Sequence, residues 1–227
     1  MLNTLKRDFS EDGVKESYSK VAWFYDCWSW LTESKAAERV IEMAKIKDGE
    51  DILEVAVGTG LVFKEILRQN PNGVNKGTDI SPNMLNRAIK LVEKLHYTNF
   101  ELVIGNAYQL PFDDQSFDLV INNFMIDLLP ESDFNHILSE FNRVLKPSGR
   151  IVISTMAFGQ KWHNKIWHLI ARTLPSLLTG CRPVSIAVNL NNVNFIVDKT
   201  EQISQFTFPS EVIYAKKSRP LQEKNIE

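Results

Sequence analysis

An apolar stretch that runs into a pair of glycines is the feature that most constrains this sequence. The stretch ILEVAVGTGLVF covers residues 52–63 and joins strand-forming residues to helix-forming residues through Gly58 and Gly60. Glycine lets the backbone turn tightly and lets a ligand approach it closely. The pattern therefore predicts a buried strand, a tight turn and a helix, with a small-molecule site at the turn.

Strand-like and helix-like segments alternate along the rest of the chain. The strands are expected at 51–56, 74–79, 100–105, 117–123, 150–155, 194–200 and 210–217. The helices between them are expected at 60–70, 81–95 and 133–145. Such alternation is typical of an α/β fold, a mostly parallel sheet with helices on both faces. The continuous apolar strands fit burial on both sides.

Length and composition narrow the class of protein. The chain has 227 residues, which fits one α/β domain with a small cap. Its net charge of −2 argues against a nucleic-acid partner. Cys27 and Cys181 match neither a metal spacing nor a disulfide framework, so no metal is expected. The N-terminus shows no signal-peptide pattern and no apolar run approaches a membrane span, so we expect a cytoplasmic protein.

The glycine turn does not fit a pyrophosphate. The dinucleotide fingerprint requires a third small residue, and that position falls on Phe63 or, one register earlier, on Leu61. The turn also lacks the Lys-Ser/Thr pair of a P-loop. A nicotinamide-dependent oxidoreductase is therefore the less favoured reading.

Asp79 ends the second expected strand, 21 residues after Gly58. A carboxylate there can accept hydrogen bonds from both hydroxyls of a ribose, and the alternative is an aspartate that only favours a helix N-terminus. Asn106 follows the third strand and can read an adenine edge, or it can form an Asx turn. Ribose recognition without pyrophosphate indicates a nucleoside-type cofactor such as S-adenosylmethionine.

Four segments together resemble the class I S-adenosylmethionine-dependent methyltransferases. They are ILEVAVGTG, GTDISPNML, GNAYQLPFDDQSFD and RVLKPSGRIVIST, in order over about residues 48–157. The Asn106-Ala107 pair and the segment YSKVAWFYD resemble the branch of quinone C-methyltransferases and small phospholipid N-methyltransferases. The resemblance implies a Rossmann-like three-layer sandwich with a seven-stranded sheet whose last strand is antiparallel. It also implies an N-terminal helical cap over 1–46, a helical lid over 157–192 and a flexible tail over 218–227.

The resemblance further implies a cofactor site. Its expected residues are Glu54, Gly58, Thr59 and Gly60 at the methionine part, Asp79 at the ribose, Ile80, Met84, Asn106 and Ala107 around the adenine, Asn123 at the sulfonium side, and Tyr18 and Tyr25 from the N-terminal segment that folds over the cofactor. The chain departs from the family at Ala56, where a glycine is frequent, and at Asn106, where aspartate is frequent. Alanine is small enough for the turn, and asparagine keeps an acceptor oxygen.

A sulfonium methyl group is already activated, so alignment and exclusion of water supply most of the catalysis. A general base is needed only if the acceptor must lose a proton. The candidates for the reacting side are Tyr25, Asp127 and His163, with Tyr18 and Asp26 close by in the sequence. Each has a structural alternative: an aromatic packing residue for the tyrosines, a solvated loop charge or helix cap for Asp127, and a satisfied core histidine for His163.

The segment 157–183 is the most informative region for the acceptor. An apolar stripe of Trp162, Ile166, Leu169, Ile170, Leu174, Leu177 and Leu178 runs beside a basic stripe of Lys161, Lys165, His168 and Arg172. The stripes predict a lid helix packed on the sheet, or alternatively a helix over 161–178 at the membrane surface. Either reading favours a small lipophilic or aromatic acceptor, a quinone precursor or a phospholipid amine. A non-catalytic module that only binds the cofactor is the alternative function.

Overall fold

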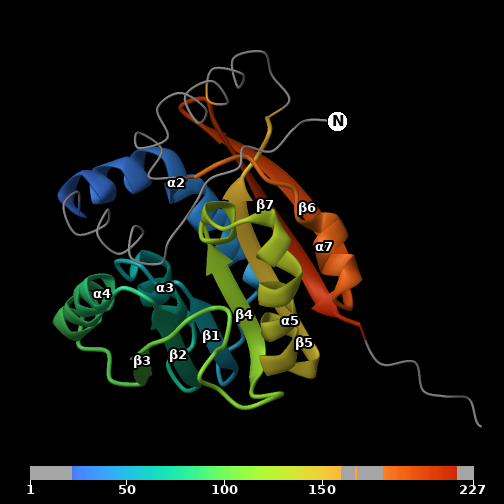
Figure 1. The fold of residues 1–227 in the computed structure, drawn as a ribbon. Helices are drawn as coiled ribbons and strands as arrows, with labels where there is room; N and C mark the ends of the chain where they lie inside the picture. Colours follow the sequence, from blue (N-terminus) through green and yellow to red (C-terminus); the bar gives the residue numbers. More distant parts are fainter. Residues whose placement is uncertain (1–21, 160–166, 168–180, 219–227) are drawn as a thin grey trace, which may run out of the picture.

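The computed structural model describes residues 22–159, 167 and 181–218, with side chains from residue 32 onward (Figure 1). A seven-stranded sheet runs through the centre in the order β3-β2-β1-β4-β5-β7-β6. Its strands are β1 (Asp51–Val55), β2 (Val74–Asp79), β3 (Phe100–Ile104), β4 (Phe117–Asn123), β5 (Leu145–Met156), β6 (Phe195–Gln205) and β7 (Phe208–Lys217). The strands from β3 to β5 pair in parallel, whereas β7 is antiparallel to both of its neighbours. The expected α/β sheet with an antiparallel last strand is confirmed.

Helices cover both faces of the sheet (Figure 1). The helices are α2 (Ala22–Ala44), α3 (Leu61–Gln69), α4 (Pro82–Lys94), α5 (Phe134–Val144) and α7 (Ala187–Asn192), with short 3-10 turns η1 (Ile126–Leu128) and η2 (Glu131–Asp133). One apolar cluster joins α2, α3 and α4 to one face, and a second joins α5 and α7 to the other. The result is the three-layer arrangement expected for the fold.

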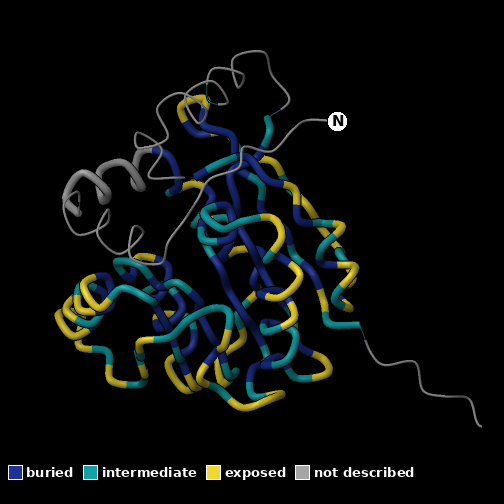
Figure 2. Tube along the Cα trace, viewed as in Figure 1, coloured by how far each residue is buried: buried dark blue, intermediate teal, exposed yellow. Residues whose placement is uncertain are grey.

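The alternation of side chains along each strand supplies both clusters. In β1, Ile52 faces the first cluster and Leu53 the second; in β4, Leu119 and Val120 divide in the same way. All four side chains are fully buried. Figure 2 shows the strands as the buried centre, with exposed residues on the outer sides of α4 and α5. Because both faces of these strands are buried, apolar residues predominate along them, which explains their apolar runs.

Local sequence signals set the N-terminus of α4. The Ser81 hydroxyl accepts a hydrogen bond from the Met84 N–H at 3.4 Å, and Pro82 occupies the first helical turn. Proline suits that position because its fixed φ is helical and no partner is needed for its nitrogen. Ser81 and Pro82 therefore fix the start of this helix, three residues after Asp79.

Two strands extend five residues beyond one of their predicted ends. β5 begins at Leu145 rather than at residue 150, because Lys146 donates to the carboxylates of Asp51 and Asp118 and the residues after it form a bulge opposite Phe117 and Leu119. β6 continues to Gln205 rather than ending at residue 200. Its added residues are largely polar because it is an edge strand, and polar edge residues give no apolar pattern.

The expected cap, lid and tail boundaries fall partly outside the described ranges and stay predictions. The segment 157–192 is described only at residues 157–159, 167 and 181–192, and the tail only at Ser218, whose N–H donates to the Asn194 carbonyl at 2.8 Å. Within the part of the chain that the structure describes, no helix is long and apolar enough to cross a membrane.

Candidate active site

The turn after β1 is held open by backbone conformations that favour glycine. Ala56, Gly58 and Gly60 have φ values of 62°, 57° and 86°. The Val57 N–H donates to the Thr78 carbonyl of β2 at 3.1 Å, which fixes the turn to the neighbouring strand. Alanine at position 56 is therefore compatible with the turn, although it adopts the left-handed region that glycine occupies more easily.

The two glycines of the turn serve different purposes. A Cβ added at Gly60 would lie 3.0 Å from the Cα of Ala88, so this glycine allows α3 and α4 to approach each other. A Cβ added at Gly58 would meet nothing within 4 Å. Gly58 therefore borders open space beyond the carboxyl end of β1, where ligands bind in open α/β sheets.

Asp79 ties the end of β2 to the glycine turn. Its Oδ2 accepts a hydrogen bond from the Gly58 N–H and its Oδ1 accepts one from the Ser81 N–H, each at 2.8 Å. The side chain is 8% exposed, and this burial raises the pKa of the carboxyl while the two N–H groups lower it. A carboxylate has about four lone-pair positions, so both oxygens retain capacity for the hydroxyls of a ribose.

Glu54 lies beneath the same turn. It is 1% exposed, and its Oε2 has no hydrogen-bond partner. Burial, followed by the nearby charge of Asp79, raises the pKa of Glu54 well above its usual range. A buried carboxyl oxygen without a partner is costly, so Glu54 is ready to receive a cationic donor such as an ammonium group.

The expected adenine side is formed by segments that follow β2 and β3. Met84 is buried, and Ile80, Asn106 and Ala107 are partly buried. The Asn106 Oδ1 accepts a hydrogen bond from the Tyr108 N–H at 3.0 Å, which forms the Asx turn that was the structural alternative for this residue. This bond uses one lone pair of the amide oxygen and holds the segment in place at the end of β3.

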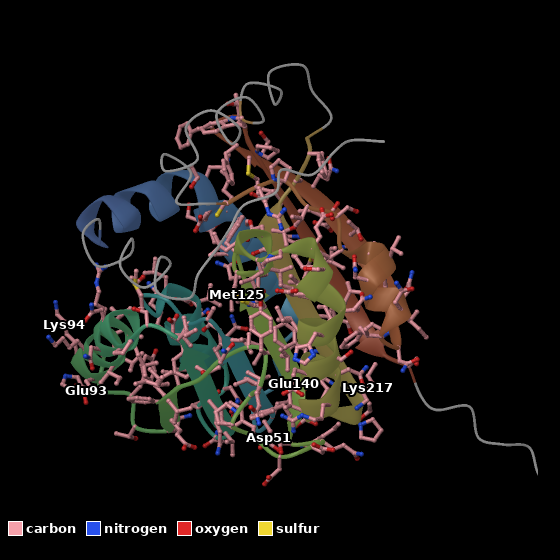
Figure 3. All side chains as sticks on the ribbon, in the orientation of Figure 1. Asp51, Glu93, Lys94, Met125, Glu140 and Lys217 are labelled. Atoms are coloured by element: carbon pink, nitrogen blue, oxygen red, sulfur yellow. The ribbon has the colours of Figure 1, made fainter. Side chains whose placement is uncertain are left out.

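The end of β4 carries a second strained turn. The Ser154 hydroxyl donates to the Asn123 Oδ1, and Phe124 follows with a φ of 48°. Left-handed backbone is unusual for an aromatic residue, and such strain concentrates at functional sites. Figure 3 shows Met125, just beyond this turn, at the opposite end of the sheet from Asp51, the first residue of β1.

Asp127 is neither a solvated loop charge nor a helix cap. It is fully buried in η1, and its Oδ2 accepts a hydrogen bond from the Met156 N–H at the end of β5 at 2.8 Å. Burial raises the pKa of Asp127 to about 7, although hydrogen bonds from the Met156 backbone and the Cys181 thiol lower it. Its direct connection is therefore to β5, and a direct contact with an acceptor stays a prediction.

Several expected site residues lie outside the described part of the chain. Tyr18 lies in the range 1–21. His163 and every residue of the apolar and basic stripes lie in the ranges 160–166 and 168–180. Tyr25 and Asp26 lie on the α2 backbone, where side chains are not described. The structure therefore brings together Glu54, the glycine turn and Asp79, and their roles in binding stay proposals.

Sequence reasoning missed two groups near the ends of β4 and β5. Phe124, Phe208 and Trp167 form a row of rings, with centroids 6.3 Å and 5.4 Å apart. Arg182 donates from Nη2 to the Leu129 carbonyl. No sequence signal marked either group, because the three rings come from three distant segments and Arg182 stands out in the sequence only as a charge after a cysteine.

The residues at the turn fit S-adenosylmethionine. The Glu54 Oε2, which has no hydrogen-bond partner, suits the ammonium group of this molecule. The open space at Gly58 suits its methionine part, and the Asp79 carboxylate suits its ribose. When bound, this molecule supplies an activated methyl group. No cluster of His, Cys, Asp and Glu able to hold a metal occurs among the residues that were described.

Comparisons with known proteins agree with this geometry. Residues 52–149 match the family described as "Methyltransferase domain". A demethylmenaquinone methyltransferase of Bacillus cytotoxicus is 32% identical over 147 residues, which cover 63% of this chain and 61% of the relative. A SAM-dependent methyltransferase structure from Aquifex aeolicus has a TM-score of 0.63 at 18% identity, covering 92% of this chain and 100% of that chain. The cyclase SpnF has a TM-score of 0.70 at 16% identity, covering 91% and 96%.

The fold and the site resemble those of class I S-adenosylmethionine-dependent methyltransferases, and residues 52–149 match the methyltransferase-domain family. The cofactor of the class is S-adenosyl-L-methionine. The chain matches about three fifths of the length of the Bacillus cytotoxicus relative, 61%. The relative's named acceptor therefore bears on this chain only as support for a proposal.

Proposed function

We propose that this protein transfers a methyl group from S-adenosylmethionine to a small lipophilic acceptor, with a quinone-type ring as the leading candidate. The observation that carries the proposal is the pairing of Glu54 and Asp79 on the two sides of the glycine turn. Their carboxyl groups suit the ammonium and ribose of this cofactor, and the open space at Gly58 lies between the two strands that bear them.

The acceptor class draws support from two further observations. The relative from Bacillus cytotoxicus is named for a quinone-type acceptor, demethylmenaquinone. In this chain, aromatic rings extend from Phe124 at the end of β4 through Phe208 to Trp167. An apolar, aromatic wall favours a ring with a hydrocarbon substituent over a sugar or a nucleotide. A phospholipid amine is the alternative acceptor.

The residues of the chain act on such an acceptor mainly by position. The Ser154–Asn123 hydrogen bond and the Phe124 turn fix the end of β4. Asp127 joins η1 to the end of β5, so the two strand ends keep one spacing. A fixed spacing holds an acceptor atom in line with the activated methyl group and keeps water away, which supplies much of the rate enhancement in a displacement.

A non-catalytic cofactor-binding role is the second candidate. A shared fold does not fix the reaction: SpnF, a chain of similar fold, is named as a [4+2]-cyclase rather than a methyltransferase. The two candidates agree on cofactor binding and differ on turnover. Product formation therefore distinguishes them.

The proposal is tested with S-adenosylmethionine labelled on its methyl group. The protein is incubated separately with a short-chain demethylmenaquinol and with phosphatidylethanolamine, and the products are partitioned between organic solvent and water. We expect label in the organic phase with the quinol. Label only with the phospholipid would replace the leading acceptor by the alternative, and no label with either would favour the non-catalytic role.

A thermal-shift measurement serves as the control for cofactor binding. S-adenosylhomocysteine at about one hundred times its dissociation constant should stabilise the protein by about 2.7 kcal/mol. NADH should produce no comparable shift, because the turn lacks a small residue at Phe63. Stabilisation by NADH alone would contradict the assignment of the site.

A further inference from the structure

Arg182 occupies the acceptor side of the fold. It follows Cys181, whose thiol hydrogen-bonds to the Asp127 carboxyl, and it precedes Val184, whose N–H donates to the Met156 carbonyl at 3.1 Å. Its own Nη2 donates to the Leu129 carbonyl beyond η1. These three connections place the guanidinium beside the carboxyl ends of β4 and β5.

Arg182 differs from other arginines of the described chain in having no carboxylate partner. Arg39, Arg68, Arg143 and Arg150 each form an ion pair with a glutamate or aspartate. For Arg182 the described contacts include one hydrogen bond, to Leu129, and its Nε is buried without a hydrogen-bond partner. Burying part of a guanidinium without an anion costs free energy, so an unmet anion is the simplest reason to retain it.

The carboxyl groups near Arg182 influence the pKa of its guanidinium but form no ion pair with it in the described structure. Burial lowers the pKa of the guanidinium, whereas the more distant charges of Glu131 and Asp127 raise it. Neither carboxyl lies within ion-pair distance in the described structure. The Oδ1 of Asp127 is also buried without a hydrogen-bond partner, so neither group satisfies the other.

We propose that Arg182 binds an oxyanion of the methyl acceptor, and that the acceptor is a hydroxyaromatic compound held as its phenolate. This inference rests on the proposed function and names the chemistry of its acceptor. Arginine suits the task because its planar fork donates several hydrogen bonds to one oxygen or to two neighbouring oxygens. On binding, the acceptor hydroxyl loses its proton to the solvent, and the electron pair left on oxygen makes the ring a stronger nucleophile.

The test uses 4-nitro-1-naphthol, whose phenol and phenolate forms absorb at different wavelengths. Binding is measured without cofactor, at a pH where the free compound is partly ionised. We expect the parent protein to bind the phenolate and to lower the apparent pKa of the bound compound. In Arg182→Met the affinity should fall at least about tenfold, the loss expected for a charge-assisted hydrogen bond, and the pKa change should disappear.

Three controls keep the result specific. Arg68→Met removes a matched charge from the far end of α3 and should bind the naphtholate like the parent. Arg182→Lys keeps the charge but not the fork and should bind with intermediate affinity. The uncharged methyl ether of the probe should bind equally to the parent and to Arg182→Met.

S-adenosylhomocysteine binding is measured on every variant, and affinity within about twofold of the parent shows that the fold and cofactor site are intact. Unchanged naphtholate binding in Arg182→Met would overturn the inference. Such a result, with cofactor binding and methyl transfer retained, would leave the methyltransferase proposal standing. A parent protein that binds the naphtholate but no S-adenosylhomocysteine would instead count against the proposed function.

Discussion

A single carboxyl group, that of Asp79, performs two tasks at the site. It accepts hydrogen bonds from the Gly58 and Ser81 N–H groups, so it fixes both the glycine turn and the residue that caps α4. The same oxygens are the ones expected to receive the ribose. Burial raises the pKa of this carboxyl, because its charged form is less favourable away from water.

Asp79→Ala is therefore expected to weaken S-adenosylhomocysteine binding by at least about 1.5 kcal/mol, because an ionic acceptor is lost from the ribose side. The measurement is isothermal titration calorimetry, with circular dichroism to show that the sheet is retained. Asp133→Ala, which removes a partly exposed carboxyl near Tyr108, is the matched control and should bind like the parent. Equal affinity in Asp79→Ala and the parent would show that the ribose lies elsewhere.

The sequence could predict the parts of this site that depend on local pattern. Gly58, Gly60 and Asp79 stand at fixed distances around buried strands, so their meeting at one sheet edge followed from the α/β topology. The burial of Asp127 could not be predicted, because it depends on Met156, 29 residues away. Arg182 was missed for the same reason: its lack of an anion is visible only when its neighbours are placed.

The hairpin between β6 and β7 turns through two residues whose backbone conformations are unfavourable for their side chains. Gln205 pairs with Phe208, and the two residues between them have positive φ values, 44° for Phe206 and 67° for Thr207. Such two-residue turns favour Asn-Gly, and a bulky or β-branched residue is strained there. Phe206 is 69% exposed, while the Thr207 Oγ1 accepts a hydrogen bond from Trp167 Nε1 at 3.0 Å.

Phe206→Asn is expected to raise the melting temperature by about 2 °C, because asparagine tolerates the left-handed region and no buried contact is lost. Differential scanning calorimetry measures the shift. Thr207→Gly should gain less or nothing, since it relieves strain but removes the acceptor of the Trp167 hydrogen bond. A lower melting temperature in Phe206→Asn would mean that the aromatic side chain stabilises the hairpin despite its exposure.

The stability of the whole molecule is linked to the protonation of its buried carboxyl groups. Burial raises the pKa of Glu54, Asp79 and Asp127, in the last case to about 7. The folded protein therefore holds these protons more tightly than the unfolded chain. The stabilisation from Asp127 is fully present below its unfolded pKa of about 4 and is lost as the pH rises to about 7.

Asp127→Asn should flatten this dependence, because asparagine does not titrate. Between about pH 5 and pH 7 the free energy of unfolding of the parent should fall by up to about 1.4 kcal/mol per pH unit more steeply than that of the variant. Urea denaturation at several pH values measures both slopes. Asp118→Asn, whose native pKa is lowered, is the control and should keep the parent's slope in this range. Parallel slopes for the parent and Asp127→Asn would show that Asp127 stays ionised in the folded protein.

The place of β7 has a consequence for the order in which the molecule can be built. Residues 208–217 leave the ribosome after the other six strands of the sheet, yet they occupy the place between β5 and β6. Until they emerge, the nascent chain carries the unpaired edges of both neighbours, and exposed edges invite pairing with other chains. The long separation between partner strands also slows closure of the sheet. Synthesis of this protein therefore passes through a stage in which the edge of β5 is unpaired, and that edge is a defined target for a chaperone.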